Sequence, residues 1–342
     1  MSQRKKYHGD RVALKIVRSG ERYYWNIYTP GFPSKGFEEV IQREIQKSTD
    51  GPASGISIQT MILSISSRCT YNCEHCYEGN NLSEKELLSY EDLCRVLDDA
   101  KRNGVRHIQL SGGEPLLRFE DLVRLIIDGG KYFDFWLSTS GYGLTKEVAK
   151  ALKKAGLTGV TVSLDHWNQD FHNRFRGHPE AWEWALKAVK HCHEAGILTN
   201  LTLCVTREMA NTTDLMKYMD LARELKVPFV RFLEARSVGS FKGTDVLLRK
   251  AEQDEVLRFY LELNSQKKYN SYPIIQYTGY HQRKLGCYGA GNRYLHVDVK
   301  GDYHACPFCR GTVGNTRDTS LREAIDALQE KGCQQFETKH YV

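Results

Sequence analysis

Apolar and polar positions follow a regular rhythm along the chain from residue 56 onward. Short apolar runs, about four to eight residues long and typical of buried strands, alternate with stretches whose apolar residues recur every three or four positions, as in amphipathic helices. Strands are predicted at 61–66, 107–110, 133–138, 160–164, 198–205 and 228–233. Helices are predicted at 90–103, 119–128, 146–155, 181–195, 213–225 and 252–264. This alternation predicts an α/β fold, a parallel sheet with helical crossovers.

The first 55 residues have a different pattern. Residues 11–17 and 23–28 are predicted to form two strands around the Ser19-Gly20 turn, followed by a helix over 37–46. Residues 48–55, which include Gly51-Pro52, have the composition of a linker. No function is predicted from this part of the chain.

Polar residues follow four successive strands at the points where the strands end. Three cysteines follow the first strand, residues 111–115 (SGGEP) the second, residues 139–141 (TSG) the third, and Ser163 and Asp165 the fourth. The carboxyl ends of parallel strands meet at one edge of the sheet, where such folds bind ligands. Each loop alone could be an ordinary turn, but four together predict a binding site at this edge.

The cysteines of the first loop carry the most specific chemistry. Cys69, Cys73 and Cys76 form a CxxxCxxC pattern within eight residues. Thiolates are soft ligands that suit iron–sulfur clusters or zinc. Three thiolates on a four-iron cluster leave one iron open to a substrate or cofactor. The alternatives are buried thiols or a structural zinc site, for which His75 could supply the fourth ligand.

This loop, with an aromatic residue (His75) just before the third cysteine, resembles the radical S-adenosylmethionine (SAM) superfamily. The resemblance implies a [4Fe–4S] cluster on the three cysteines, which are also the catalytic residues. Its open iron would be chelated by SAM, and its electron would cleave SAM to a 5′-deoxyadenosyl radical. The residues implied to bind SAM are His75, Gly112, Gly113, Glu114, Pro115, Thr139, Ser140, Ser163, Asp165 and Arg176.

In the resembled family the Gly-Gly-Glu-Pro stretch binds the SAM amino group, Ser-x-Asp lies near the ribose and methionine, and an arginine pairs with the SAM carboxylate. Arg176 matches that arginine, and the nearby Arg174 is the alternative. The chain departs from the family pattern at two positions. It has Ser140 where the family often has asparagine, and it has His166 after the aspartate where the family commonly has glycine. Two roles are open for His172. It could act as a base on the substrate, or it could be a surface or capping residue.

A second cysteine group lies near the C-terminus. Cys287, Cys306, Cys309 and Cys333, together with Gly301 and Gly314-Asn315, resemble the SPASM and Twitch auxiliary-cluster domains. Because four thiolates complete the ligand set of one [4Fe–4S] cluster, the shorter, Twitch-like form with a single auxiliary cluster is favoured. A structural zinc site on the same cysteines remains the local alternative. Cys94, Cys192 and Cys204 are interpreted as core thiols.

The resemblance sharpens the fold prediction to a partial (β/α)6 TIM-like barrel with a small auxiliary-cluster domain. The predicted division is 1–55 for the N-terminal hairpin, helix and linker, 56–236 for the radical SAM barrel, and 237–342 for the auxiliary-cluster domain.

Composition narrows the cellular setting. The 342 residues include ten cysteines, and the charged N-terminus is not followed by an apolar signal segment. This combination favours a reducing, cytoplasmic compartment and metal ligation over disulfides. No apolar run is long enough for a membrane span. The net charge of +6 is spread along the chain, which argues against nucleic-acid binding.

The predicted function is reductive cleavage of SAM followed by hydrogen abstraction from a substrate, with peptide or protein modification favoured. The alternatives are a radical SAM dehydrogenase or related enzyme acting on a small metabolite, and a non-catalytic iron–sulfur or zinc module. The predicted partners are the substrate and a one-electron reductant such as flavodoxin or ferredoxin.

Overall fold

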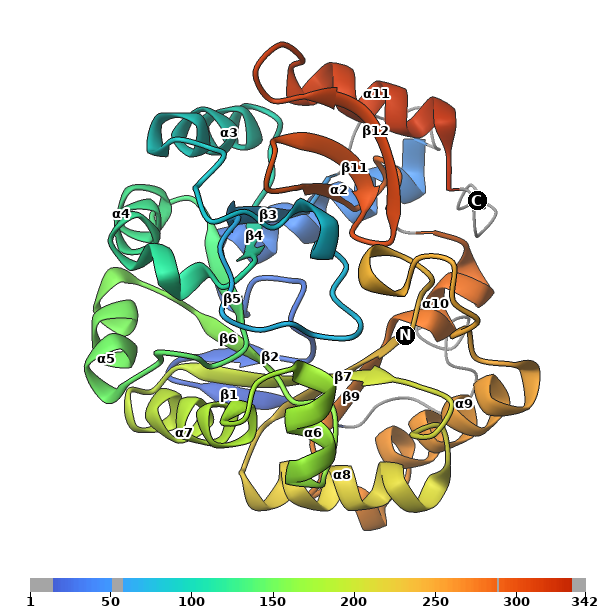
Figure 1. The fold of residues 1–342 in the computed structure, drawn as a ribbon. Coiled ribbons are helices and arrows are strands. Elements are labelled where there is room, and N and C mark those ends of the chain that lie inside the picture. The colour runs from blue at the N-terminus through green and yellow to red at the C-terminus, as the bar shows by residue number, and fades with distance from the viewer. Residues whose placement is uncertain (1–14, 51–57, 288, 334–342) are drawn as a thin grey trace.

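The computed structural model describes residues 15–50, 58–287 and 289–333, and is built around one curved sheet (Figure 1). The strand order is β12-β11-β10-β3-β4-β5-β6-β7-β8-β9. Neighbouring strands from β10 through β3 to β9 run parallel. The strands that form the barrel wall are β3 (Thr60–Ser66), β4 (His107–Gly112), β5 (Asp134–Thr139), β6 (Gly159–Ser163), β7 (Leu198–Val205), β8 (Phe229–Glu234) and β9 (Ile274–Tyr277). The predicted partial TIM-like barrel is therefore confirmed, with β9 as an additional strand.

The long helices that connect the barrel strands lie on the outer face of the curved sheet (Figure 1). Those predicted are α3 (Tyr90–Arg102), α4 (Phe119–Gly129), α5 (Lys146–Ala155), α7 (Ala181–Glu194), α8 (Thr212–Glu224) and α9 (Lys250–Ser265). Those not predicted are α6 (Gln169–Arg176), α10 (Thr278–Leu285) and the 3₁₀ turns η1 (Gly79–Asn81), η2 (Pro115–Arg118), η3 (Gly239–Phe241) and η4 (Lys267–Tyr269). Each predicted helix buries an apolar stripe against the sheet, which contributes about 1.5–3 kcal/mol for each fully buried leucine or isoleucine. Ser89 and Asp92 form the capping box that starts α3.

The C-terminal part continues the same sheet. Strand β10 (Tyr294–Val297) pairs in parallel with β3, and β11 (Asp302–Cys306) and β12 (Cys309–Asn315) extend that edge as an antiparallel hairpin before α11 (Leu321–Lys331). The hydrogen-bonded sheet thus runs across the predicted boundary at residue 236 in both directions, through β9 and through β10. The division into domains remains a prediction.

The N-terminal part closes one end of the barrel. It contains a short hairpin, β1 (Val17–Ser19) and β2 (Arg22–Tyr24), and helix α2 (Lys35–Asp50). Tyr24 and Ile27 are buried against Leu198, Phe229 and Ile274, the first residues of β7, β8 and β9. The segment therefore plugs the amino-terminal end of the barrel.

The predictions for this N-terminal segment were only partly correct. The turn at Ser19-Gly20 is present, while most of the strand predicted at 11–17 lies outside the described residues. The strand predicted at 23–28 ends earlier, at Tyr24. The predicted linker begins too early, because α2 extends through Asp50, and residues 51–57 are not described.

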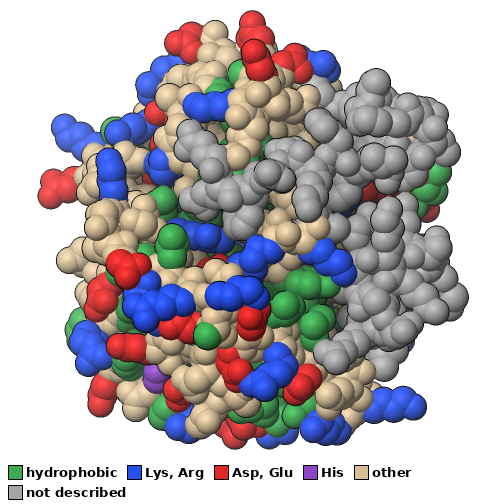
Figure 2. All heavy atoms as spheres, turned by 90° about the vertical axis from the view of Figure 1, so that its right-hand side faces the viewer, with side chains coloured by type: hydrophobic (Ala, Val, Ile, Leu, Met, Phe, Trp, Pro, Cys, Tyr) green, Lys and Arg blue, Asp and Glu red, His purple; other side chains and the backbone are tan. Residues whose placement is uncertain are grey.

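The surface carries both signs of charge. Figure 2 shows one face on which Lys and Arg side chains are interspersed with Asp and Glu, beside a patch of hydrophobic side chains. Within the described residues, no helix combines the length and the apolar character needed to span a bilayer.

Candidate functional site

The first cysteine group lies on the irregular loop that leaves β3 at the carboxyl edge of the sheet. Two neighbouring segments hold this loop through main-chain hydrogen bonds. The Glu74 amide donates to the Phe175 carbonyl (3.0 Å), and the Ser240 amide donates to the Cys76 carbonyl (2.9 Å). The spacing of the three thiols is thus fixed by α6 on one side and by η3 on the other.

All three thiols of this group line a cavity of about 560 Å³ inside the barrel. Burial raises the pKa of Cys69 to about 12 and that of Cys76 to about 11. In the metal-free protein these thiols stay protonated at neutral pH, so binding of a metal cluster must displace their protons. Three soft donors that face a cavity of this size fit a cluster with one open position.

The Gly-Gly-Glu-Pro loop that follows β4 lies directly against the cysteine loop. The Gly113 amide donates to the Ser66 carbonyl and the Glu114 amide to the Arg68 carbonyl, both at 2.7 Å. A Cβ atom on Gly112 would lie 2.3 Å from the Ser66 carbonyl oxygen, and one on Gly113 would lie 2.2 Å from that of Arg68. Only glycine allows this approach, which also exposes the backbone of both glycines to the cavity.

Glu114 connects this loop to the one after β5. Its buried carboxylate accepts hydrogen bonds from Thr139 Oγ1 (2.7 Å), the Ser140 amide (2.8 Å) and Ser140 Oγ (2.5 Å). Burial raises the pKa of Glu114 above its usual value, an effect that these hydrogen bonds reduce. Pro115 begins η2 behind the loop. Thr139 and Ser140 are part of the cavity wall, and Glu114 holds them in position.

Asp165 and Arg176 form a buried ion pair at the same edge. Arg176 Nε lies 2.5 Å from Asp165 Oδ2, and the Cys204 amide donates to Asp165 Oδ1 at 2.8 Å. Burial alone would raise the pKa of Asp165, but the Arg176 guanidinium, together with His75, His172 and the Cys204 amide, holds the pKa below the ordinary value. Arg176 Nη1 lies 3.8 Å from Cys73 Sγ, so the guanidinium is also adjacent to the cysteine loop.

Of the two arginines considered from the sequence, Arg176 lines the main cavity, together with Ser163 and Asp165, while Arg174 covers the ring of Phe171 outside it. His172 is fully buried, and its Nδ1 accepts from the Asp165 amide. Burial lowers the pKa of His172 to about 3, so it is a neutral acceptor inside the protein. The burial of His172 contradicts the surface role considered for it. His172 is not part of the main cavity wall, and its role as a substrate base stays an untested prediction.

The structure also gathers the second cysteine group. Cys306 ends β11, Cys309 begins β12, and Cys333 returns to them after α11. The thiols of Cys287 and Cys309 both lie within hydrogen-bonding reach of Cys333, and those of Cys306 and Cys309 within reach of each other. Four sulfur donors in one place are a donor set that suits a complete [4Fe–4S] or zinc shell.

Comparisons with known proteins agree with this geometry. The family model described as "Radical SAM superfamily" matches residues 63–222. A probable GTP 3′,8-cyclase from Saccharolobus solfataricus is 30% identical over 291 residues, which cover 81% of this chain and 92% of that protein. The chain belongs to the radical SAM superfamily.

Other relatives match over shorter lengths or in fold alone. A GTP 3′,8-cyclase from Aliarcobacter butzleri is 30% identical over 188 residues, 53% of this chain and 57% of that protein, so the match spans little more than half of the relative. The structure of Streptococcus suis SuiB bound to precursor peptide SuiA has a similar fold, with a TM-score of 0.65 at 17% identity. The match covers 89% of this chain and 72% of the SuiB chain. The cofactors of the superfamily are a [4Fe–4S] cluster and SAM.

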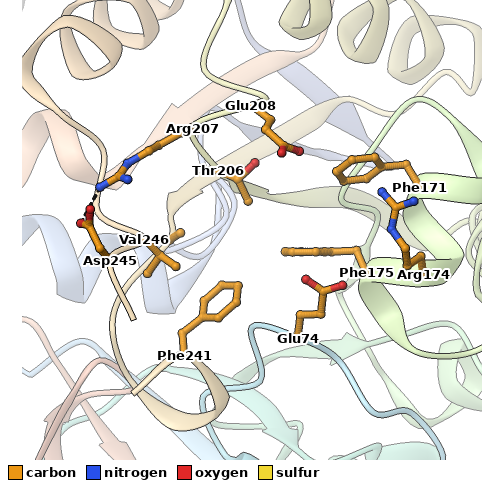
Figure 3. A pocket seen from close by; sticks show the side chains of 11 residues that line it. Glu74, Phe171, Arg174, Phe175, Thr206, Arg207, Glu208, Phe241, Asp245 and Val246 are labelled. Carbon is orange, nitrogen blue, oxygen red and sulfur yellow. Dashed lines mark hydrogen bonds and ion pairs between the residues drawn. The ribbon is translucent and has the colours of Figure 1, made fainter. Parts of the chain in front are cut away.

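This radical SAM protein has a second, smaller pocket beside the cysteine loop, about 340 Å³ in volume (Figure 3). Aromatic rings of Phe171, Phe175 and Phe241 line it, and Arg207 pairs with Asp245 at its rim. The Phe175 ring also stacks on His75, with centroids 4.4 Å apart and planes at 6°. The aromatic residue before the third cysteine is thus fixed from behind by α6.

A buried polar network joins the two cysteine groups of this radical SAM protein. Glu78, two residues after Cys76, accepts from Arg310 Nη2 at 3.0 Å, and Arg310 directly follows Cys309. Arg310 also donates to Asp298 (3.1 Å), which lies 3.1 Å from His304 Nε2. No residue of this network was predicted, because Glu78 lies far in the sequence from Asp298, His304 and Arg310.

Polar side chains inside the barrel were also not predicted, although one feature of the sequence indicates them. Arg231 interrupts the apolar strand 228–233 at a position whose neighbours, Val230 and Phe232, are fully buried outside the cavity. A charged residue on the inward face of such a strand indicates a ligand or a partner there. Cys204, interpreted as a core thiol, also lies in this cavity wall.

Proposed function

We propose that this protein is a radical SAM enzyme that removes a hydrogen atom from a substrate bound in the barrel cavity. The observation that carries the proposal is the cavity itself. Its wall contains Cys69, Cys73 and Cys76 of the first group and Cys306, Pro307 and Phe308 of the second. A substrate in this cavity would contact both cysteine groups at once.

When bound, the family's cluster and SAM supply the hydrogen-abstracting radical, so the protein has to bind, orient and exclude water. Cys69, Cys73 and Cys76 would hold the cluster, and the main chain at Gly112 and Gly113 would contact SAM. Ser163 and Arg176 line the cavity beside them and would provide further polar contacts. The N-terminal plug, through Tyr24 and Ile27, closes the far end of the barrel against solvent.

We further propose that the second group, Cys287, Cys306, Cys309 and Cys333, holds an auxiliary [4Fe–4S] cluster. The four thiols lie close to one another, which supports four protein ligands and a closed ligand shell around the cluster. From the cavity wall such a cluster would orient the substrate or accept an electron from the substrate radical. The physiological reductant is proposed to be a flavodoxin or ferredoxin.

A peptide or protein is the proposed substrate class. The support is the fold likeness to SuiB, whose structure contains a precursor peptide. A small metabolite is the second candidate, favoured by the sequence relatives named GTP 3′,8-cyclase and by the plugged barrel end, which makes the cavity a closed-ended site.

Anaerobic reconstitution tests the chemistry. Reduced enzyme is expected to form 5′-deoxyadenosine and methionine from SAM slowly without substrate, whereas the Cys73→Ala variant is expected to form none. Equal product from both proteins would refute the proposed reaction at the first cysteine group, and no product from wild type would favour a non-catalytic iron–sulfur or zinc module.

Deuterium transfer tests the substrate class. Enzyme and SAM are incubated with deuterated host extract that has been separated into peptide and small-metabolite fractions. Deuterium in 5′-deoxyadenosine with the peptide fraction supports the proposal. Label that arrives only with the small-metabolite fraction overturns the peptide assignment and supports the second candidate.

A further inference from the structure

A row of polar side chains crosses the inner wall of the barrel at one level. Ser163 on β6 is in register with Thr202 on β7, Thr202 with Arg231 on β8, and Arg231 with Gln276 on β9. All four residues line the main cavity. Parallel strands lie about 4.8 Å apart, so the backbone of Arg231 is roughly 10 Å from that of Ser163 along this row.

Arg231 carries a charge that its surroundings do not balance. Its Nε donates to Thr202 Oγ1 (3.2 Å), and its Nη1 reaches across the barrel to Gln109 Oε1 (3.4 Å). Among the described residues, no carboxylate lies within 4.0 Å of its guanidinium. Neutral hydroxyl and amide acceptors compensate a half-buried cation only partly.

The other arginines of the cavity wall differ in this respect. Arg176 pairs with Asp165 at 2.5 Å, Arg293 with Glu44 at 2.7 Å, and Arg236 lies 3.5 Å from Glu234. Arg231 is therefore the cation of this wall that has no acidic partner within the described part of the chain. An anion in the cavity would be attracted to it in particular.

Gln276 gives a second, independent indication. Its side chain is 8% exposed and lines the cavity, yet among the described residues neither its Nε2 nor its Oε1 has a hydrogen-bond partner. Buried polar atoms are normally paired, and an unpaired one costs about 1–3 kcal/mol. A ligand that accepts a hydrogen bond from Nε2 would relieve this cost.

We propose that Arg231 and Gln276 bind an oxyanion carried by the substrate, either a carboxylate or a phosphate. The guanidinium donates a charge-assisted pair of hydrogen bonds, and the amide adds a third donor. This inference rests on the proposed function, because it takes the same cavity as the substrate site. It adds that the substrate is anionic and that its charged end lies two strands away from Ser163.

Anion binding by the full-length protein tests the proposal. Inorganic phosphate and acetate serve as separate probes, titrated calorimetrically at constant ionic strength into wild type, Arg231→Gln, Arg231→Lys and Arg293→Gln. Arg293 is the matched control, because it lines the same cavity but already has a carboxylate partner.

Wild type and Arg293→Gln are expected to bind one of the probes at least about tenfold more tightly than Arg231→Gln, with Arg231→Lys between them. The preferred probe identifies the group as phosphate or carboxylate. No binding by wild type, or equal binding by wild type and Arg231→Gln, overturns the proposal. Should the Gln variant fail to fold, Arg231→Lys and Gln276→Leu provide the same comparison.

A competition experiment separates this site from the SAM site. Saturating SAM is expected to leave the dissociation constant of the probe unchanged, whereas displacement of the probe would assign Arg231 to SAM and overturn the inference. The proposed function fails independently, if wild type forms no 5′-deoxyadenosine, and that result does not alter the anion titration.

Discussion

The two cysteine groups differ in how the chain assembles them. The first has three thiols on one loop, and its geometry is set by main-chain contacts with Phe175 and Ser240. The second takes its thiols from three separate segments, after α10, at the β11–β12 turn and after α11, and these meet only when the C-terminal part is folded. With a metal bound, a group on one loop would tie together only that loop, whereas a group assembled from separate segments would also cross-link the fold.

This contrast predicts different consequences when a thiol is removed. Loss of a first-group thiol should affect chemistry with little effect on the fold. Loss of a second-group thiol should affect cluster retention and folding, while the first group retains its own reaction.

The largest effect is expected for Cys73→Ala. With two thiolates left, the first group cannot hold its cluster, so iron and sulfide should fall from about eight of each per chain to about four. Iron analysis and the yield of 5′-deoxyadenosine measure both losses. Cys94→Ala, which removes a thiol on α3, is the control and should keep wild-type values.

Cys333→Ala should weaken the second group selectively. The remaining three thiolates leave one iron exposed, so the auxiliary cluster becomes labile or loses one iron, and iron content falls toward about four on dilution with a chelator. Electron paramagnetic resonance would follow the three-iron form. An unchanged spectrum and iron content would show that Cys333 is not a ligand.

Arg310→Met tests the network between the two groups. It leaves the carboxylates of Glu78 and Asp298, which are 1% exposed, without their shared cation. Removing one partner of a buried pair costs about 3–5 kcal/mol in the free energy of unfolding. Chemical denaturation of the holoprotein measures the loss. The double variant Arg310→Met/Glu78→Gln should recover part of it, and a simple sum of the two single effects would contradict the coupling.

Asp298→Asn is expected to have a smaller, pH-dependent effect. Burial alone would raise the pKa of Asp298, but hydrogen bonds from His304 and from the Asp302 and Lys300 amides lower it from 3.8 to about 2. The ionised carboxylate therefore stabilises the fold above pH 4, and this contribution is lost as the pH falls through about 2.

The difference in unfolding free energy between wild type and Asp298→Asn should be about 2 kcal/mol at pH 7 and should shrink in acid. Urea denaturation of both proteins at several pH values measures it. A difference that stays constant down to pH 3 and below would contradict the assigned pKa.

The sequence predicted most of the barrel because its strands and helices carry strong periodic patterns. Strands β3 to β8 and the helices that cover them were found to within a few residues. Strands β9 and β10 were missed because each has only four residues, and their pairing with distant strands decides their structure. Helix α6 was missed because it is short and largely polar.

The candidate site divides along similar lines. The residues at the strand ends could be placed at one edge because parallel topology brings them together. The Arg231–Gln276 row could not, since it depends on the register between β8 and β9. The Glu78–Arg310 pair joins residues 232 positions apart, and no local pattern encodes such a contact.

The pairing of β10 with β3 sets the distance between the two cysteine groups across the cavity. The cysteine loop and the turn at Pro307 and Phe308 face each other across the cavity. Both are attached to strands of one hydrogen-bonded sheet. Under the proposed function, a substrate would therefore have to fit the distance that the sheet sets between these two surfaces. Evolution of a wider or narrower specificity would proceed by changing the side chains that face the cavity, such as Phe308, while the spacing of the two sites stays the same.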